Sequence, residues 1–176
     1  MKFTPVPLDG AYLVELEPVF DERGFFARSW SSKEFGQHGL NANLAQCSIS
    51  FNPQRATLRG MHYQEQPYRE TKLVRCSSGA IFDVIVDLRP ASVSYCKWFS
   101  VELTAANRKM VYVPDGFAHG FQTLTDDAEV LYQISEEYRS EYSKGVRWDD
   151  PLFGIAWPLA VSVLSARDRS FPNYVP

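Results

Sequence analysis

From Ala45 onward the chain alternates apolar and polar residues in short runs, which is the pattern that β-strands produce. The clearest run covers residues 80–89, where one face carries Ala80, Phe82, Val84, Val86 and Leu88. Its other face carries Ile81, Asp83, Ile85 and Asp87. Further strands are predicted over 12–16, 71–76, 98–103, 109–113, 117–124 and 129–135, with turns at 77–79 and 114–116. Short strands with frequent turns and little helix predict an all-β sandwich or barrel of the jelly-roll type.

The segments outside this β-rich region predict one hairpin and two short helical turns. Residues 20–26 form a polar turn that leads through Gly24 into aromatics, which suits either a plain hairpin or an arginine and two phenylalanines that clasp a flat ring. Ser31 with Glu34 three residues later starts a capped helix, and His38-Gly39 ends it with His38 on the surface. Residues 165–169 resemble a single capped turn. We see no linker and no repeat, so one domain over residues 1–176 is expected.

Composition and charge narrow the class of protein. With 176 residues, 14% aromatic and 22% charged, the chain has the composition of a folded globular domain. A net charge of -3 offers no electrostatic attraction to nucleic acid or to an anionic membrane, so neither partner is expected. The first ten residues lack the apolar core of a signal peptide, and no apolar run is long enough to span a bilayer. Cys47, Cys76 and Cys96 are odd in number and widely spaced, which favours reduced thiols in a cytoplasmic protein.

The stretch 57–64 concentrates the candidate chemistry. Strict strand alternation would put Arg59, Met61 and Tyr63 on one face and His62 on the other, between Gly60 and Gln64. His62 would then point into a pocket whose floor is Gly60, where a ligand can approach the backbone closely. A lone histidine in a strand is more commonly a hydrogen-bonded structural group, and this alternative stays open.

His119 raises the possibility of a metal site. It ends the run Pro114-x-Gly116-x-x-His119, which resembles the second cupin motif, a turn that delivers a histidine into a barrel. Metal-binding cupins normally show His-x-His with a following glutamate, whereas this chain has His62-Tyr63-Gln64, with Glu70 as the one nearby carboxylate. A metal prefers at least three firm protein ligands, and this chain offers two histidines and one doubtful glutamate. These ligands are too few to favour a metal-dependent cupin. We therefore expect no metal and no cofactor.

The same residues suit proton transfer without a metal. His62 could act as a general base, since imidazole titrates near neutral pH, and Asp168 is a candidate to orient it. Tyr132 could supply a proton and Lys72 could stabilise an enolate oxygen. Three of these residues have simpler alternatives: Tyr132 as a core tyrosine, Lys72 as a surface lysine and Asp168 as a helix N-terminal charge.

Taken together, the motifs resemble the dTDP-4-dehydrorhamnose 3,5-epimerase family, a group of metal-free cupins. The matching stretches follow the family's order over nearly the whole chain: FDERGFF (20–26), LRGMHYQ (58–64), KLVRCSSGAIFDVIVDLR (72–89), VPDGFAHGFQTL (113–124), VLYQIS (130–135), DDPLFGIAWP (149–158) and LSARDR (164–169). The resemblance implies a homodimer of cupin jelly-roll barrels with a few short helices. It also implies an isomerase of deoxysugar biosynthesis that inverts C3, C5 or both in a nucleotide-linked 4-keto-6-deoxy sugar.

The resemblance also implies roles for individual residues. His62 would remove a proton next to the C4 ketone with Asp168 orienting it, and Tyr132 would return a proton on the opposite face of the sugar. Lys72 and His119 would attend the enolate oxygen. The expected substrate-binding contacts are Arg59 on the diphosphate, Gln46 and Tyr138 in the pocket, and Phe20, Arg23 and Phe26 on the nucleotide, reaching across the dimer from the N-terminal region.

Two departures from the family pattern bear on substrate preference. Arg28 stands where the family usually has a glutamate that meets the base, and the segment 46–56 is one residue longer than usual. An arginine offers only donors, which suit cytosine N3 and O2 better than thymine N3–H. A CDP-linked sugar is therefore an alternative to a dTDP-linked one. Alternatives of another class are a metal-dependent cupin enzyme and a non-catalytic sugar-nucleotide binding protein.

Overall fold

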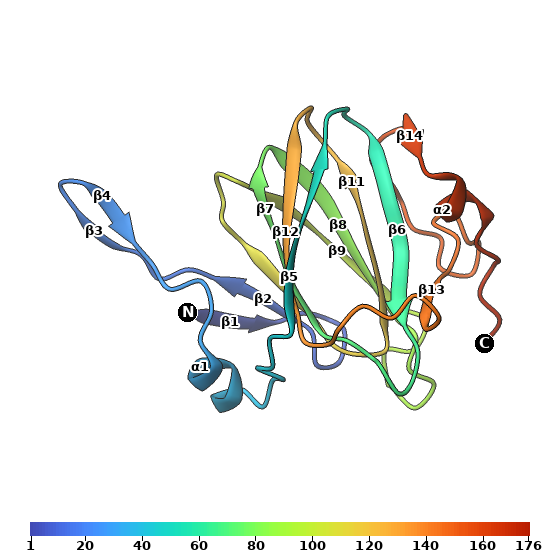
Figure 1. The fold of residues 1–176 in the computed structure, drawn as a ribbon, viewed down its shortest axis with the longest axis horizontal. Helices are drawn as coiled ribbons and strands as arrows, with labels where there is room; N and C mark the ends of the chain where they lie inside the picture. Colours follow the sequence, from blue (N-terminus) through green and yellow to red (C-terminus); the bar gives the residue numbers. More distant parts are fainter.

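The structure of the chain is a computed structural model that describes residues 1–176, in which two β-sheets face each other (Figure 1). The first sheet has the order β1 (Lys2–Pro5), β2 (Tyr12–Glu15), β10 (Met110–Val113), β7 (Lys72–Ser78), β12 (Ala128–Ile134), β5 (Gln46–Asn52). The second has the order β13 (Ser143–Gly145), β6 (Thr57–Gln64), β11 (Phe117–Thr123), β8 (Ala80–Asp87), β9 (Trp98–Thr104), with β14 (Val163–Leu164) parallel to β6. This arrangement confirms the predicted all-β jelly-roll fold.

Strand β8 shows how the alternation in the sequence builds two packed layers. Ile81 and Ile85 face the space between the sheets, where they pack with Val74 of β7 and Phe121 of β11. Val84 and its alternate neighbours face the other way, into a second apolar cluster that the C-terminal segment covers. Because both faces of β8 are buried, the strand is apolar almost throughout, and a carboxylate on its inner face needs a partner inside the barrel.

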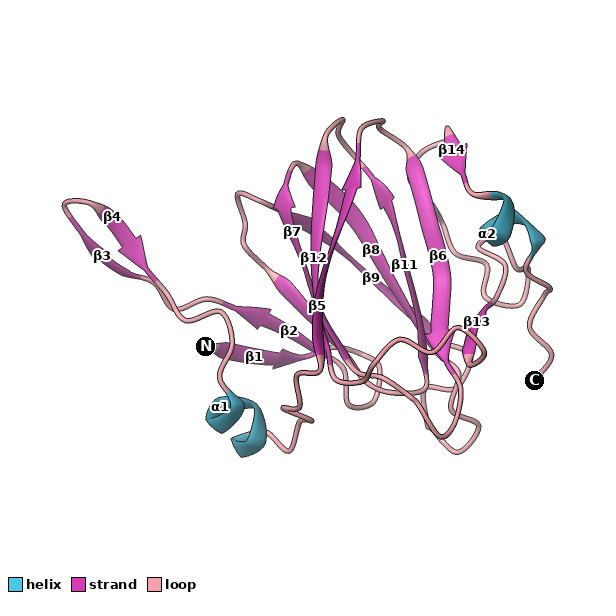
Figure 2. Ribbon diagram, in the orientation of Figure 1, coloured by secondary structure: helices cyan, strands magenta, loops and turns pink.

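The short elements at the two ends of the chain also match their predicted starts (Figure 2). Helix α1 (Ser32–Gln37) begins after Ser31, whose hydroxyl accepts a hydrogen bond from the backbone N–H of Glu34, and His38 after it is exposed. Helix α2 (Ala166–Ser170) begins after Ser165, which accepts in the same way from Asp168. Strand β7 runs two residues further than predicted, so its turn is confined to Gly79 with φ +72°. No helix is long and apolar enough to cross a membrane.

The predicted hairpin stands away from the barrel. Strands β3 (Val19–Asp21) and β4 (Gly24–Phe26) pair only with each other and project beyond the sheets (Figure 1). Phe20 is 71% exposed and Phe26 78% exposed. Side chains of this kind are normally buried, so the hairpin presents an apolar surface that the barrel of its own chain does not cover.

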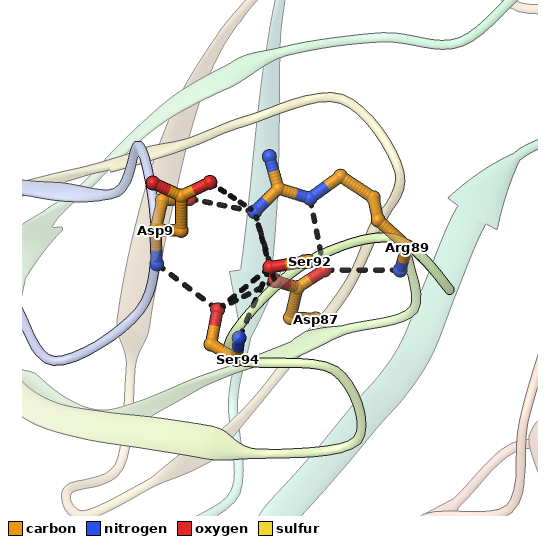
Figure 3. Close-up of polar contacts among 5 residues, drawn as sticks. All are labelled: Asp9, Asp87, Arg89, Ser92 and Ser94. Atoms are coloured by element: carbon orange, nitrogen blue, oxygen red, sulfur yellow. Dashed lines mark hydrogen bonds and ion pairs between the residues drawn. The ribbon is translucent and has the colours of Figure 1, made fainter.

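A buried carboxylate at the end of β8 joins two loops to the barrel. Asp87 accepts hydrogen bonds from the backbone N–H and the guanidinium of Arg89 and from the hydroxyls of Ser92 and Ser94 (Figure 3). Arg89 also donates to the carbonyl of Asp9, between β1 and β2 (2.7 Å). Burial raises the pKa of Asp87, but the donors outweigh it, so the pKa of the carboxyl lies below its usual value.

This cluster predicts acid-sensitive stability. Because the folded pKa of Asp87 is lowered, its contribution is present above the unfolded pKa of about 3.9 and is lost as pH falls through the folded pKa. We expect Asp87→Asn to lower the free energy of unfolding at pH 7 by on the order of 3 kcal/mol and to flatten its decline below about pH 4. Urea unfolding at several pH values measures both effects.

The matched control is Asp149→Asn. Asp149 makes a comparable ion pair with Arg147, but both side chains are more than a third exposed. Exposed pairs contribute about 0–1 kcal/mol, so this substitution should have little effect. Equal losses in the two variants would contradict the role given to Asp87.

Candidate active site

A cavity of about 460 Å³ opens between the two sheets, with side chains from β5 and β12 on one side and from β6 and β11 on the other. Seven of the residues singled out in the sequence line it: Gln46, Arg59, His62, Lys72, His119, Tyr132 and Tyr138. The fold therefore brings together residues that lie as far apart in the chain as Gln46 and Tyr138.

The centre of the site is a hydrogen-bonded pair formed by His62 on β6 and Asp168 on α2. His62 Nε2 lies 2.8 Å from Asp168 Oδ1, and the other carboxylate oxygen accepts from the backbone N–H of Gly60 at 3.1 Å. Burial raises the pKa of Asp168, but hydrogen bonds from His62 and from the Gly60 N–H outweigh it and hold that pKa below its usual value. The pair that the sequence suggested therefore exists as an ionised carboxylate oriented on an imidazole.

His62 keeps one face toward the cavity. Its side chain is 36% exposed, whereas that of Asp168 is 5% exposed. The ring of Phe171 meets the imidazole edge-on, with centroids 5.8 Å apart. Since Nε2 is engaged by Asp168 and no protein group bonds Nδ1, Nδ1 is the nitrogen that can take a proton from a bound molecule.

A second histidine–carboxylate pair lies deeper in the barrel. His119 Nε2 is 2.8 Å from Asp83 Oδ2, with the two side chains only 4% and 1% exposed. Asp83 Oδ1 is buried without a hydrogen-bond partner. Asp83 was not among the predicted site residues, although a signal was present: it lies between Ile81 and Ile85 on the inner face of β8, where the one other polar residue is Asp87 at the end of the strand.

Tyr132 lies across the cavity from His62, on β12 of the opposite sheet. Its ring packs against the barrel core and meets the ring of His119 edge-on at 5.9 Å. Burial raises the pKa of its phenol, and the nearby charge of Asp83 raises it further. The phenol therefore stays protonated near neutral pH, as a group that donates a proton must.

Lys72 is a buried residue of the cavity rather than a surface lysine. Its Nζ lies 2.9 Å from a carboxylate oxygen of Glu70, and both side chains are 10% exposed. Glu70, considered from the sequence only as a possible metal ligand, is the ion-pair partner of Lys72. The pair keeps a donor fixed at the wall of the cavity.

Arg59 lies on a different face of β6 from the one that was predicted. Strict alternation put Arg59 on the face opposite His62, but both side chains line the same cavity. The register of β6 against β11 shifts between His119 and Phe121, which breaks the alternation. Arg59 Nε donates to Asn52 Oδ1 at 2.7 Å, which holds the guanidinium at the cavity wall.

The expected role of Gly60 also changes. A Cβ at Gly60 would lie 2.6 Å from Gly120 Cα of β11, and the residue has φ +138°. Glycine is therefore required for close packing of two strands. Gly60 is not among the residues that line the cavity, so the prediction that it forms the floor of the ligand pocket is wrong.

Arg167 is a site residue that the sequence analysis missed. It lies beside Asp168 on α2 and lines the cavity, where its Nη2 donates to Ser143 Oγ at 2.8 Å. Neither Arg167 nor Arg59 has a carboxylate within ion-pair distance. Two guanidinium groups without counter-charges at one cavity suit a multiply charged anion.

Four predicted substrate contacts do not reach the cavity of their own chain. Phe20, Arg23 and Phe26 lie on the projecting hairpin, where Arg23 pairs with Asp21. Arg28 forms an ion pair with Glu34 of α1 at 3.0 Å. No group of three or more His, Cys, Asp or Glu side chains is arranged to hold a metal ion, and freedom from metal stays a prediction.

The site places an imidazole hydrogen-bonded to a carboxylate on one sheet and a protonated phenol on the other, an arrangement that suits proton transfer. Together with the jelly-roll fold, these groups define a cupin-type carbohydrate epimerase, which is an isomerase. The family model for dTDP-4-dehydrorhamnose 3,5-epimerase matches residues 5–175. The chain belongs to the dTDP-4-dehydrorhamnose 3,5-epimerase family.

Individual relatives agree over the whole chain. A dTDP-4-dehydrorhamnose 3,5-epimerase of Methanothermobacter thermautotrophicus is 42% identical over 97% of this chain and 92% of its own length. The crystal structure of such an epimerase from Elizabethkingia anophelis superposes with a TM-score of 0.96 at 36% identity, covering 99% of this chain and 96% of that one. A Legionella pneumophila epimerase in complex with dTDP-4-keto-L-rhamnose has a TM-score of 0.91 at 33% identity, covering 98% and 92%.

Proposed function

We propose that the protein inverts C3, C5 or both of a nucleoside-diphosphate 4-keto-6-deoxy sugar, by removing a proton on one face and adding one on the other. The observation that carries the proposal is the placement of His62, oriented by Asp168, and Tyr132 on opposite sheets of one cavity. Inversion requires a base and an acid on opposite faces of the same carbon, and this arrangement supplies both.

The chemical step follows from the acidity of a C–H bond next to a ketone. His62 Nδ1 takes the proton from C3 or C5, and the electron pair of the broken bond moves onto the C4 oxygen to give an enolate. Lys72 and His119 line the cavity and are the donors that stabilise this oxygen. Tyr132 then gives its proton to the same carbon from the other side and the C4 ketone re-forms. The phenolate recovers a proton from solvent, and the His62 imidazolium releases its proton to solvent.

The diphosphate of the substrate has two candidate partners. Arg59 on β6, the strand that carries His62, and Arg167 on α2 both border the cavity, and neither forms an ion pair with a carboxylate. The protein as a whole carries a net charge of -3, so these local guanidinium groups must supply the attraction. Gln46 and Tyr138 line the same cavity and complete the binding surface.

Product analysis tests the function. The protein is incubated with dTDP-linked and CDP-linked 4-keto-6-deoxy sugars, and NMR identifies the configuration at C3 and C5. We expect inversion of at least one centre and no change on adding a metal chelator. Binding without inversion would support a non-catalytic sugar-nucleotide protein, and activity restored by one particular metal after chelation would support a metal-dependent cupin.

The projecting hairpin supports a homodimer in which each chain completes the other's site. Its exposed side chains Phe20 and Phe26 have a counterpart on β5, where Ile49 is 63% and Phe51 53% exposed. Two copies that cover these surfaces would bury apolar area that one chain leaves in water. In this arrangement Phe20, Arg23 and Phe26 hold the nucleotide in the partner's cavity.

Mixing two inactive variants tests the exchange of hairpins. We expect Phe26→Ala and His62→Ala to be strongly impaired alone, and their 1:1 mixture after subunit exchange to regain roughly a quarter of wild-type activity. In a mixed dimer the intact hairpin of one chain meets the intact His62 of the other. Phe25→Ala, on the same hairpin, serves as the comparison variant, because Phe25 is 41% exposed whereas Phe26 is 78% exposed. A mixture that stays inactive would mean that each hairpin serves its own chain.

The nucleotide preference is proposed to depend on Arg28. It stands beside the hairpin and forms an exposed ion pair with Glu34, so the side chain can exchange this partner for a nucleobase at modest cost. An arginine donates to cytosine N3 and O2 but cannot accept from thymine N3–H. We therefore propose that CDP binds at least as well as dTDP.

Calorimetry with CDP and dTDP measures this preference. Arg28→Glu should shift the relative affinity toward dTDP by about 1–3 kcal/mol, the usual cost of an unmatched buried polar group. Arg55→Glu is the control, because Arg55 is exposed and donates to the carbonyl of Leu124 at a distant loop. If dTDP binds more tightly than CDP and Arg28→Glu does not change this, Arg28 does not set the nucleotide preference. Stacking of the base would then be the source of affinity.

A further inference from the structure

A second cavity, of about 300 Å³, lies where the hairpin joins the barrel. Its walls come from the stem of the hairpin (Phe25, Ala27 and Ser29) and from the barrel (Leu16, Arg75, Cys76, Ser77, Ala105 and Arg108). None of these residues lines the active-site cavity. The cavity is therefore a separate feature of the molecule, which we call the hairpin-stem cavity.

The register of the first sheet brings two arginines to this cavity. Arg75 of β7 pairs with Met110 of β10 and points away from the barrel interior, where its neighbours Val74 and Cys76 pack. Arg108 precedes Met110 by two residues, so it borders the same outer face. Residues placed diagonally on adjacent strands lie close enough for long side chains to converge.

The charge of the two arginines is not balanced within the chain. Neither takes part in any ion pair. No acidic residue lines the cavity, and Glu129 on the adjoining strand β12 is engaged by the hydroxyl of Ser77 at 2.8 Å. The cavity is thus a locally positive site in a protein whose net charge is -3.

Hydrogen bonding points in the same direction. Arg75 Nε is buried and has no acceptor in the protein. The guanidinium of Arg108 lies 4.7 Å from the ring centroid of Phe25. Of its nitrogens only Nη1 donates a hydrogen bond within the protein, to the carbonyl of Ala106. A buried donor without a partner is costly, and a bound ion is one of the few ways in which native proteins satisfy it.

Comparison with the other arginines shows what this arrangement suits. Arg23, Arg28, Arg89 and Arg147 each have a carboxylate within 3.0 Å. Arg55, Arg69, Arg139 and Arg169 form no ion pair either, but none of them lines the active-site cavity or the hairpin-stem cavity. Arg59 and Arg167 also share a cavity, in which the carboxylate of Glu70 is engaged by Lys72, and the proposed function gives these two arginines a diphosphate. Arg75 and Arg108 repeat the same chemistry at the hairpin stem.

We propose that the hairpin-stem cavity is an oxyanion site that binds phosphate or a phosphate monoester. Arg75 and Arg108 supply the charge, and the hydroxyls of Ser29 and Ser77, which line the same cavity, are further donors. An anion held there contacts both the hairpin stem and the barrel. Its binding therefore restrains the hairpin relative to the barrel of the same chain, from which the hairpin projects (Figure 1).

Titration with inorganic phosphate tests the proposal. It is carried out with the variant Arg59→Gln, which lacks one of the two arginines that could bind phosphate in the active-site cavity. Phosphate should bind this variant, and adding Arg75→Gln or Arg108→Gln should weaken binding by about tenfold or more, since a charge-assisted bond becomes a neutral one. Adding Arg55→Gln should leave binding unchanged, because Arg55 lines neither cavity. Phosphate should also slow amide hydrogen exchange in residues 19–26 of the wild-type protein but not of Arg75→Gln.

The outcomes separate this site from the catalytic one. Phosphate affinity that is unchanged by Arg75→Gln and Arg108→Gln would overturn the proposal, whether or not the protein is an epimerase. The proposal would also be overturned if a carboxylate of a second copy filled the cavity. In that case phosphate would not bind the hairpin-stem cavity, and the dimer would dissociate in Arg75→Gln and in Arg108→Gln. If Arg75→Gln fails to fold, Arg108→Gln decides, since Arg108 is exposed outside the strands.

Discussion

Replacing His62 by alanine should lower the rate of solvent-deuterium exchange at C3 and C5 of the bound sugar by about 10²–10⁴-fold, the usual contribution of a positioned base. His62 presents one nitrogen to the cavity while Asp168 holds the other at 2.8 Å. Nucleotide binding should persist, because the candidate diphosphate contacts Arg59 and Arg167 are unchanged. Proton NMR in heavy water measures the exchange, and calorimetry with dTDP measures the binding.

Two further variants make this prediction specific. His62→Asn keeps a donor for Asp168 but cannot act as a base, so it should lose exchange as His62→Ala does while folding normally. His38→Ala removes an exposed histidine on the far side of the first sheet and should exchange at the wild-type rate. Loss of only a few-fold in both His62 variants would assign the base role to another group.

Tyr132→Phe should separate proton removal from inversion. His62 stays in place, so exchange at C3 or C5 should continue, whereas formation of the inverted product should fall by about 10²–10⁴-fold for lack of an acid on the opposite face. The raised pKa of Tyr132, caused mainly by burial, keeps the phenol protonated in the pH range where the base works. The two rates are read from the same NMR experiment in heavy water.

Tyr63→Phe is the matched control for this substitution. Tyr63 also lines the cavity and has a pKa raised by burial, but it lies on β6, the same strand as His62. It cannot reach the face opposite the base, so its removal should leave inversion largely unchanged. Normal inversion by Tyr132→Phe would return Tyr132 to the role of a core residue.

Local patterns predicted the elements well. Two-residue alternation placed β8 and divided its residues between two faces, because successive side chains of a strand point to opposite sides. Each face packs into a different apolar cluster. Serine caps located the starts of α1 and α2, since the cap hydrogen bond involves only residues three apart. The family motifs added the contact between His62 and Asp168, which are 106 residues apart.

Contacts between distant strands were harder to predict. The register shift places an extra residue on β6, which takes three residue steps from Arg59 to His62 where β11 takes two, and moves Arg59 onto the face of His62. Gly60, a glycine inside the strand, is the local signal for such a bulge, but it does not say which side chains the bulge brings to one face. Asp83 and Arg167 were missed because their partners, His119 and Ser143, come from other segments of the chain. The direction in which the hairpin projects from the barrel likewise cannot be read from the alternation of its residues.

The most direct test of the two-face mechanism is the origin of the hydrogen at the inverted carbon. Wild-type protein is given a dTDP-linked 4-keto-6-deoxy sugar in heavy water for a single turnover, and NMR reads C3 and C5 of the product. With His62 and Tyr132 on opposite sheets, every inverted centre should carry deuterium, because the proton taken on one face cannot return on the other. Inverted product that retains its original hydrogen at that carbon would contradict the account.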